Sequence, residues 1–385
     1  MGTKLIFNNG RFKIMQIADV QEFKSVSPDT VKLLELAIRE EKPDLIIFSG
    51  DQIYGIHPLI WGKSPDKNVR DVISQLLAPV QKAGVPFAVT FGNHDAESGV
   101  TKERQAEFYA EIPGYMPGEK RSKTDPGTFF LPVYTENGQE KFAVYAFDTH
   151  GSSASGGKSG VTNDQLKWFA EMRERENKAL GALPPAIVFQ HIPVPEYYNV
   201  LKRVKKGTRG SVEAYGEHKN KFYVLPEEIK QQGGFMKESP AVTEENTGEF
   251  DVLRADGGVK ALSVGHDHNN SFVCDYLGIK LIYTQGAGFH VYGPHLKRGV
   301  RLFTIDETDP SAFITYTRTW ESLTSSLPKK PLLEFFLTHT PTGMDQALTI
   351  VKRASPFALA GCAAAGCAAY LAIKQVKNKK ISKIF

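Results

Sequence analysis

Short apolar runs that end in polar residues alternate with helical patterns along the first hundred residues. Residues 12–18, 44–49 and 85–91 are almost continuously apolar, as expected for strands buried on both faces. Apolar residues at helical spacing predict helices from Ser27 to Lys42 and over 69–83. This order of elements predicts parallel neighbouring strands that are joined by right-handed crossovers.

Beyond residue 111 the pattern changes to shorter, antiparallel-looking strands. Residues 127–133 and 141–147 flank a turn at Glu136-Asn-Gly138, which is typical of a hairpin. Residues 193–250 are rich in Pro, Gly, Lys and Glu and have weak periodicity, so we interpret them as an insertion over the mouth of a site. The remaining predicted elements are helices at 102–111 and 162–178 and strands at 186–190, 259–264, 271–283, 299–305 and 312–320.

Polar residues follow five of these predicted strands at the point where each strand ends. One histidine after a strand is usually packed or hydrogen-bonded, and an Asn or Asp there often caps a helix. Five strand ends that all deliver Asp, Asn or His indicate instead a site at the carboxyl edge of the sheet. These residues are Asp19, Asp51, Asn93 with His94, His191, and the pair His266 and His268.

Carboxylate, amide and imidazole groups without thiolates favour Mn, Fe or Zn ions. Two such ions roughly 3.5–4 Å apart form a hydrolytic site. We expect Asp51, the most central carboxylate, to bridge them, and a bridging hydroxide to attack phosphorus. His94 would lie beside the ions and protonate the leaving oxygen, while Asp95 would hold its imidazole in place.

Five short blocks together resemble the signature of the calcineurin-like metallophosphoesterases over about residues 12–320. They are Asp19-x-Gln21, Gly50-Asp51-x-x-Tyr54, Gly92-Asn-His-Asp95, Val188-x-x-His191 and Gly265-His-x-His268. The resemblance implies a mixed α/β fold, a four-layer αββα sandwich of two mixed sheets flanked by helices, with a dinuclear metal site. Carried over residue by residue, the first metal would be bound by Asp19, Asp51 and His268, and the second by Asp51, Asn93, His191 and His266.

One position departs from the family pattern, because most members have a ligating His where this chain has Gln21. Purple acid phosphatases also lack that His and use a Tyr ligand, which Tyr54 matches. Either Tyr54 completes the first site and favours a ferric ion, or Gln21 ligates weakly through its amide oxygen, or water fills the position. Tyr54 could equally be a packed residue with a hydrogen-bonded hydroxyl. Asp95 stands where purple acid phosphatases typically have Glu, and the chain lacks the signal peptide of most secreted members. It is therefore similar to an intracellular, purple-acid-phosphatase-like branch and not to a typical purple acid phosphatase.

Two more histidines are candidates for substrate binding. His150 follows a strand in Asp148-Thr-His150, where a simple loop turn is the alternative. His290 lies in the glycine-rich run 286–293, which would be flexible near a substrate. Residues 202–209 include five basic side chains that could steer anionic substrates or simply form a solvated loop.

Composition narrows the class of protein. The chain has 385 residues and a net charge of only +4, which gives no case for a nucleic-acid partner. Three cysteines, at 274, 362 and 367, do not make a disulfide framework and fit a reducing compartment. The N-terminus carries no pattern of a signal peptide, so we expect a cytoplasmic catalytic domain.

The last part of the chain has a different character. We expect a catalytic domain over 1–325, a linker over 326–350 and an apolar segment with a basic tail over 351–385. Residues 355–373 contain no charge and have the length of a membrane span. They are rich in alanine, so a buried helix docked on the domain is the alternative. A span here would be a tail anchor that leaves the catalytic domain in the cytoplasm.

The sequence therefore predicts a phosphoric ester hydrolase that acts on a phosphorylated substrate and carries two divalent or mixed-valence metal ions. Hydrolysis of phosphodiesters or nucleotides at the same site is one alternative. A non-catalytic metal-binding scaffold, which the Gln21 substitution would allow, is the other.

Overall fold

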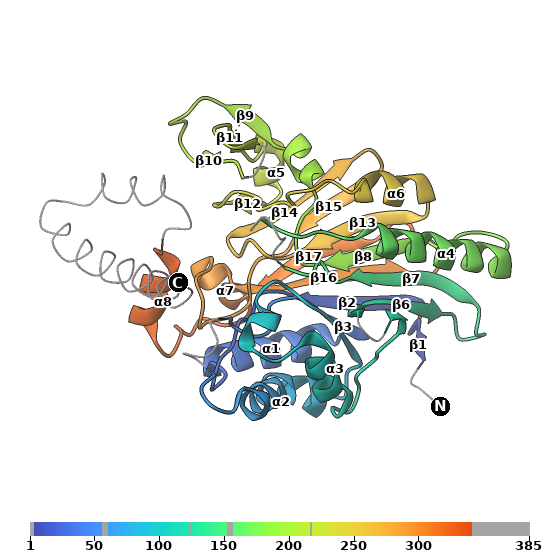
Figure 1. The fold of residues 1–385 in the computed structure, drawn as a ribbon, viewed down its shortest axis with the longest axis horizontal. Coiled ribbons are helices and arrows are strands. Elements are labelled where there is room, and N and C mark those ends of the chain that lie inside the picture. Colours follow the sequence, from blue (N-terminus) through green and yellow to red (C-terminus); the bar gives the residue numbers. More distant parts are fainter. Residues whose placement is uncertain (1–3, 56–60, 123–124, 152–156, 216–217, 341–385) are drawn as a thin grey trace, which may run out of the picture. The chain divides into compact units, whose positions relative to one another are not determined.

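The structure is a computed structural model that describes residues 4–55, 61–122, 125–151, 157–215 and 218–340. The chain divides into two compact units, residues 1–339 and 340–385. Almost all of the second unit lies outside the described residues, so the fold below is that of the first unit (Figure 1).

One of its two large sheets has five strands in the order β17-β16-β2-β3-β4. The strands β2, β3 and β4 are parallel, as the sequence predicts, and β16 and β17 are added antiparallel at the β2 edge. The bounds are β2 (Arg11–Ile17), β3 (Leu45–Ser49), β4 (Phe87–Thr90), β16 (Gly299–Asp306) and β17 (Ile314–Thr319).

The other large sheet has nine strands and is mixed, with the main order β1-β6-β7-β8-β13-β15-β14-β12 and β5 paired to β6. Its centre, β7-β8-β13-β15, is parallel, and hairpins close both sides. The single strand expected over 271–283 is a hairpin. The bounds are β1 (Leu5–Ile6), β5 (Glu119–Ser122), β6 (Asp125–Tyr134), β7 (Glu140–Phe147), β8 (Ala186–Gln190), β12 (Phe235–Met236), β13 (Val259–Val264), β14 (Asn270–Tyr276) and β15 (Ile279–Tyr283).

The two sheets pack face to face through a shared apolar layer. Ile14 and Ile47 of the five-stranded sheet and Val144 and Ile187 of the nine-stranded sheet belong to one fully buried cluster. Because each sheet also buries its outer face under helices, the predicted four-layer αββα sandwich is confirmed.

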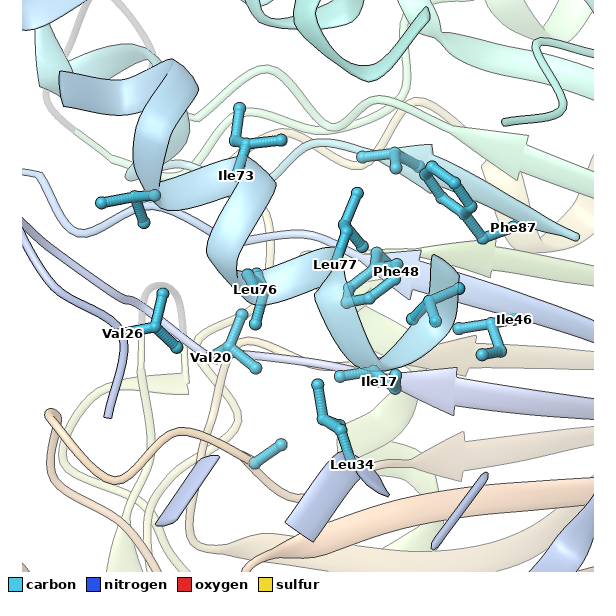
Figure 2. Packing of buried hydrophobic residues seen from close by; sticks show 14 of the residues in the cluster. Ile17, Val20, Val26, Leu34, Ile46, Phe48, Ile73, Leu76, Leu77 and Phe87 are labelled. Carbon is cyan, nitrogen blue, oxygen red and sulfur yellow. The ribbon is translucent and has the colours of Figure 1, made fainter. Parts of the chain in front are cut away.

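Helices on the five-stranded sheet are α1 (Pro28–Glu41), α2 (Pro65–Ala83), α3 (Lys102–Ala110) and α7 (Trp320–Leu323). Figure 2 shows Leu76 and Leu77 of α2 over Ile17, Ile46 and Phe48 of the sheet. The nine-stranded sheet is covered by α4 (Asn163–Leu180) and α6 (Glu249–Asp256). Fully burying each such aliphatic side chain contributes about 1.5–3 kcal/mol.

Local signals set the helix ends. Thr162 caps α4 with a complete capping box in which Gln165 reaches back to the cap backbone. Ser27 caps α1, and Pro28 follows in its first turn. Helix α2 ends at Gly84, which adopts the left-handed conformation that closes many helices.

The segment 193–250 has more regular structure than its weak periodicity suggested. It forms a three-stranded sheet in the order β10-β11-β9 and adds β12 to the nine-stranded sheet. Strands of two or three residues are too short for an apolar pattern to be visible in the sequence. The bounds are η2 (Pro195–Val200), β9 (Lys202–Val204), β10 (Val212–Glu213), β11 (Phe222–Val224) and α5 (Glu227–Gln231). The role of this segment as a cover over the site mouth stays a prediction.

The membrane anchor predicted for residues 355–373 needs correction. In the part of the chain that the structure describes, no helix is long and apolar enough to cross a bilayer. The segment itself lies outside the described residues, and its alanine content gives it little apolar surface. The predicted transmembrane helix, membrane association and tail-anchored location are therefore not retained. The last described helix is α8 (Pro331–Thr338).

Candidate metal centre

Both sheets deliver polar residues to the same place. Asp19, Asp51 and Asn93 follow β2, β3 and β4 of the five-stranded sheet, whereas His191 and His266 follow β8 and β13 of the nine-stranded sheet. The sequence predicted one shared sheet edge, but the structure instead brings together the carboxyl ends of two facing sheets. The chain turns back after strands of both layers, and the side chains meet there.

Three of these residues form a compact, buried cluster. Ligand atoms of Asp51, His191 and His266 all lie within 4.8 Å of one another. His191 Nε2 is 3.2 Å from Asp51 Oδ2 and 3.2 Å from His266 Nδ1. Two imidazoles and a carboxylate at this spacing, without thiolates, suit a borderline divalent cation.

Asp19 and His268 lie next to this cluster. His268 Nε2 is 3.4 Å from Asp19 Oδ1, and that oxygen is 3.9 Å from His191 Nε2. Asp19 Oδ1 and Asn93 Oδ1 are buried acceptors without a hydrogen-bond partner among the described residues. Burying an unpaired acceptor is costly, so both oxygens fit a site that a cation would complete.

The backbone at the site is held in a strained conformation. Asp19, Asp51 and His266 have φ angles of 53°, 55° and 74°, in the left-handed region that non-glycine residues avoid. Each such residue costs on the order of 1–3 kcal/mol, and this strain gathers at functional sites. Gly50 and Gly92 must lack a side chain, because a Cβ there would collide with His191 and with Asp51.

Backbone carbonyls fix the orientation of two imidazoles. His191 Nδ1 lies 3.1 Å from Ser49 O, and His268 Nδ1 lies 2.8 Å from Tyr292 O. Nδ1 therefore donates in both rings, which directs each Nε2 toward the cluster. The Tyr292 ring stacks on His268 at 4.1 Å between centroids.

Burial and charge push the pKa values of the cluster apart. Burial raises the pKa of Asp51, but the charges of His191 and His94 lower it well below its usual value. Burial lowers the pKa of His191, but Asp51 and Asp19 raise it to about 9. Burial lowers the pKa of His266 well below its usual value, so this imidazole is neutral, the form that binds metals.

Gln21 points its amide into the cluster. Gln21 Nε2 donates to Asp51 Oδ2 at 2.9 Å and lies 3.3 Å from His268 Nε2. An amide nitrogen has no lone pair for a metal, so ligation by Gln21 requires the amide to turn its oxygen toward the cluster.

Tyr54 packs beside the proposed acid. Its ring is 6.1 Å from the His94 ring at an angle of 13° and 5.7 Å from that of Phe23. Burial and the negative charge of Glu97 raise the Tyr54 pKa, which favours the neutral phenol. Its role as a metal ligand stays a prediction.

The surroundings of His94 differ from the expectation. The Asp95 carboxylate accepts from the backbone N–H groups of Asp51, Gly92 and Ile53 at 2.7–3.0 Å. The partner of His94 Nδ1 is Glu97, at 2.7 Å. Burial lowers the pKa of His94, but Asp51 and Glu97 raise it above its usual value.

The sequence patterns did not single out Glu97, although its position three residues after His94 was a usable signal. Residues three apart on a helical turn are neighbours, and η1 (Asp95–Ser98) is such a turn. Asp95 thus shapes the loop between the strands, and Glu97 contacts the imidazole.

The substrate-binding roles of His150 and His290 stay predictions. His150 donates its backbone N–H to Asp148 Oδ1 at 2.8 Å, and its side chain is 38% exposed. His290 Nδ1 is 2.7 Å from Oε2 of Glu22, a buried carboxylate that the sequence did not suggest.

Lys158 is a further residue that the sequence did not suggest. Burial is the main cause that lowers the pKa of His266, and the positive charge of Lys158 lowers it further, which indicates that Lys158 lies near the cluster.

The chain belongs to the calcineurin-like phosphoesterase family, whose model matches residues 12–270. This match covers more than half of the chain and includes every proposed metal ligand. The predicted superfamily is therefore confirmed.

Curated relatives connect the chain with the purple-acid-phosphatase-like branch. "Probable inactive purple acid phosphatase 14" and "Probable inactive purple acid phosphatase 29" of Arabidopsis thaliana are 27% and 28% identical over 334 and 341 residues. The first alignment covers 75% of this chain and 74% of the relative, and the second covers 79% of each. "Phosphatase DCR2" of Saccharomyces cerevisiae is 26% identical over 69% of this chain and 45% of that protein.

Proposed function

We propose that this chain is a metal-dependent hydrolase of phosphate esters. The cluster of Asp51, His191 and His266, whose ligand atoms lie within 4.8 Å of one another, is the observation that carries the proposal. Family membership supports it. In the proposed arrangement one ion would be held by Asp19, Asp51 and His268, with Tyr54 or Gln21 in addition, and the other by Asp51, Asn93, His191 and His266.

Bound divalent cations would supply a water of lowered pKa and would neutralise charge on the phosphoryl oxygens. The side chains around them have other tasks. His94, next to Tyr54 and 2.7 Å from Glu97, protonates the leaving oxygen. Lys158 attracts the anionic substrate. The buried ligands exclude bulk water, which strengthens these interactions.

Hydrolysis of 4-nitrophenyl phosphate by the full chain, with Mn, Fe or Zn added, tests this function. Asp51→Asn should abolish activity, because Asp51 belongs to both proposed ligand sets. His94→Ala should reduce activity by about 10²–10⁴-fold. Asp71→Asn, an exposed change of the same chemistry on α2, is the matched control. Activity that survives both site changes would contradict the proposal.

A non-catalytic metal-binding protein is the second candidate. Two observations favour it: Gln21 donates to Asp51 Oδ2 within the cluster, and the names of the two Arabidopsis relatives include the word "inactive". Metal analysis together with the activity assay separates the candidates. A scaffold would retain bound metal but would hydrolyse neither 4-nitrophenyl phosphate nor its diester with any of the three metals.

Monoester and diester hydrolysis share the same metal chemistry. Comparing 4-nitrophenyl phosphate with bis(4-nitrophenyl) phosphate distinguishes them, since a phosphodiesterase prefers the second. An absorption spectrum of iron-loaded protein tests Tyr54: a visible charge-transfer band that disappears in Tyr54→Phe supports ligation, and its absence contradicts a tyrosinate ligand.

A further inference from the structure

The small sheet β10-β11-β9 carries a basic groove whose lining includes none of the proposed metal ligands. The groove has a volume of about 610 Å³. It is lined by residues of all three strands and their turns: Arg203, Val204, Lys205, Lys206, Glu213, Asn220, Lys221 and Phe222. Four of these eight side chains are cationic and one is acidic, although the whole chain carries a net charge of only +4.

Among the described residues, no ion pair neutralises the cations of this groove. Arg203, Lys205, Lys206 and Lys221 form no ion pair in the described part of the chain, whereas surface cations such as Arg70 and Arg175 do. Lys206 lies 5.5 Å from the centre of the Phe222 ring, which holds its ammonium over the groove. Like charges that line one groove repel one another, so a bound anion would relieve the repulsion.

The sheet also offers backbone hydrogen bonds. β9 and β10 are its outer strands, and each pairs on one side only with β11. Figure 1 shows these three strands as a separate small sheet beside α5 and β12. An outer strand with free N–H and C=O groups accepts an extended peptide as an additional strand.

We propose that this groove docks an acidic, extended segment of a partner protein. Carboxylates of the segment would pair with Lys205, Lys206 and Arg203, and its backbone would pair with the free edge of β9. Glu213 in the lining favours a peptide, which has N–H donors, over a nucleic-acid backbone, which has none. Phe222 is only 8% exposed, so the groove offers no open ring on which bases could stack.

Fluorescence anisotropy of a labelled peptide of alternating glutamate and serine measures this binding to the full chain. The peptide should bind at low salt and dissociate as salt screens the charges. Lys205→Glu combined with Lys206→Glu should weaken binding by about tenfold or more. The milder pair Lys205→Gln with Lys206→Gln should give a smaller loss and guards against misfolding of the reversed variant.

Arg39→Glu combined with Lys82→Glu, which makes the same charge change on α1 and α2, is the matched control and should bind like the wild type. Absence of wild-type binding at low salt, or equal binding by the groove variants, would overturn the proposal. So would tighter binding of a thymidine oligonucleotide or of vesicles rich in phosphatidylserine. Hydrolysis of 4-nitrophenyl phosphate should be unchanged in the groove variants, so this result is independent of the proposed function.

Discussion

At the scale of the single residue, Gln21 controls how complete the first proposed metal site is. Its amide nitrogen lies 2.9 Å from Asp51 Oδ2 and 3.3 Å from His268 Nε2. This nitrogen has no lone pair for a cation, whereas a ligand at the same place would need one. The neighbouring cluster around His191 and His266 has no such defect. The two positions should therefore bind metal with unequal affinity.

Replacing Gln21 with His should strengthen the weaker position, because imidazole is a good ligand for Mn, Fe or Zn. After desalting, elemental analysis should find the bound metal rising from about one to about two ions per chain. Gln21→Ala, which removes the amide without adding a ligand, is the control and should not increase the metal content. Equal stoichiometry in wild type and Gln21→His would contradict unequal sites.

Glu97 gives a second prediction at this scale. Glu97→Gln should slow hydrolysis of a phosphate ester with a poor alkyl leaving group by roughly tenfold or more, because protonation by His94 then limits the rate. Hydrolysis of 4-nitrophenyl phosphate, whose leaving group needs little protonation, should change much less. Glu103→Gln on α3 is the exposed control. An equal loss with both substrates would show that Glu97 does not act through the acid.

At the scale of the element, Arg298 connects α8 with the loop 288–292, whose Tyr292 carbonyl oxygen contacts His268 Nδ1. It is fully buried, donates to the carbonyls of Gly288 and Val291, and pairs with Glu334 of α8 at 3.0 Å. Arg298→Met should reduce the free energy of unfolding by about 3–5 kcal/mol, because Glu334 then stays buried without its partner.

Urea denaturation measures this loss, and Glu334→Leu in the same chain should restore most of it, because the buried charge is then removed as well. Arg104→Met, at an exposed ion pair of α3, should leave the midpoint nearly unchanged. A double variant no more stable than Arg298→Met alone would contradict the pairing argument.

Helix α6 carries a buried carboxyl whose titration should be visible in stability. Burial raises the pKa of Glu249 to about 8. Because the folded pKa lies above the unfolded one, the folded chain binds this proton more tightly, and that stability is lost as the pH rises toward 8. Between about pH 5 and pH 8, the free energy of unfolding should fall in the wild type as Glu249 loses its proton. In Glu249→Gln this fall should be smaller, by a difference of a few kcal/mol. The exposed control Glu245→Gln should follow the wild type.

At the scale of the whole molecule, both sheets supply ligands, so metal binding should stabilise the entire sandwich. Adding Mn or Zn at about a hundredfold excess over the dissociation constant should contribute about 2.7 kcal/mol. Thermal unfolding should show a raised Tm that EDTA reverses, and Asp51→Asn should remove the shift. A Tm that is insensitive to both metal and EDTA would contradict a site that joins the sheets.

The sequence predicted much of this molecule because its strongest signals are local. Continuous apolar runs located β3 and β8, and each run ends at a residue of the cluster, Asp51 or His191. The division of the strands between two sheets came only from the family resemblance, since an apolar run does not encode which strand lies beside it. Glu22 escaped notice because its contact with His290 joins residues 268 positions apart.

The pairing of His191 with His266 has a consequence for how the fold can vary. These two side chains are 75 positions apart, yet their ring nitrogens lie 3.2 Å from each other, so the intervening chain is a closed loop in the polymer sense. The entropy of closing such a loop grows only logarithmically, and doubling its length costs about 0.6 kcal/mol. Exposed turns of the segment with the small sheet can therefore be lengthened at little cost in closure entropy, provided that its buried side chains such as Tyr197 and Tyr223 are kept. A change of partner need not alter the spacing of the ligands.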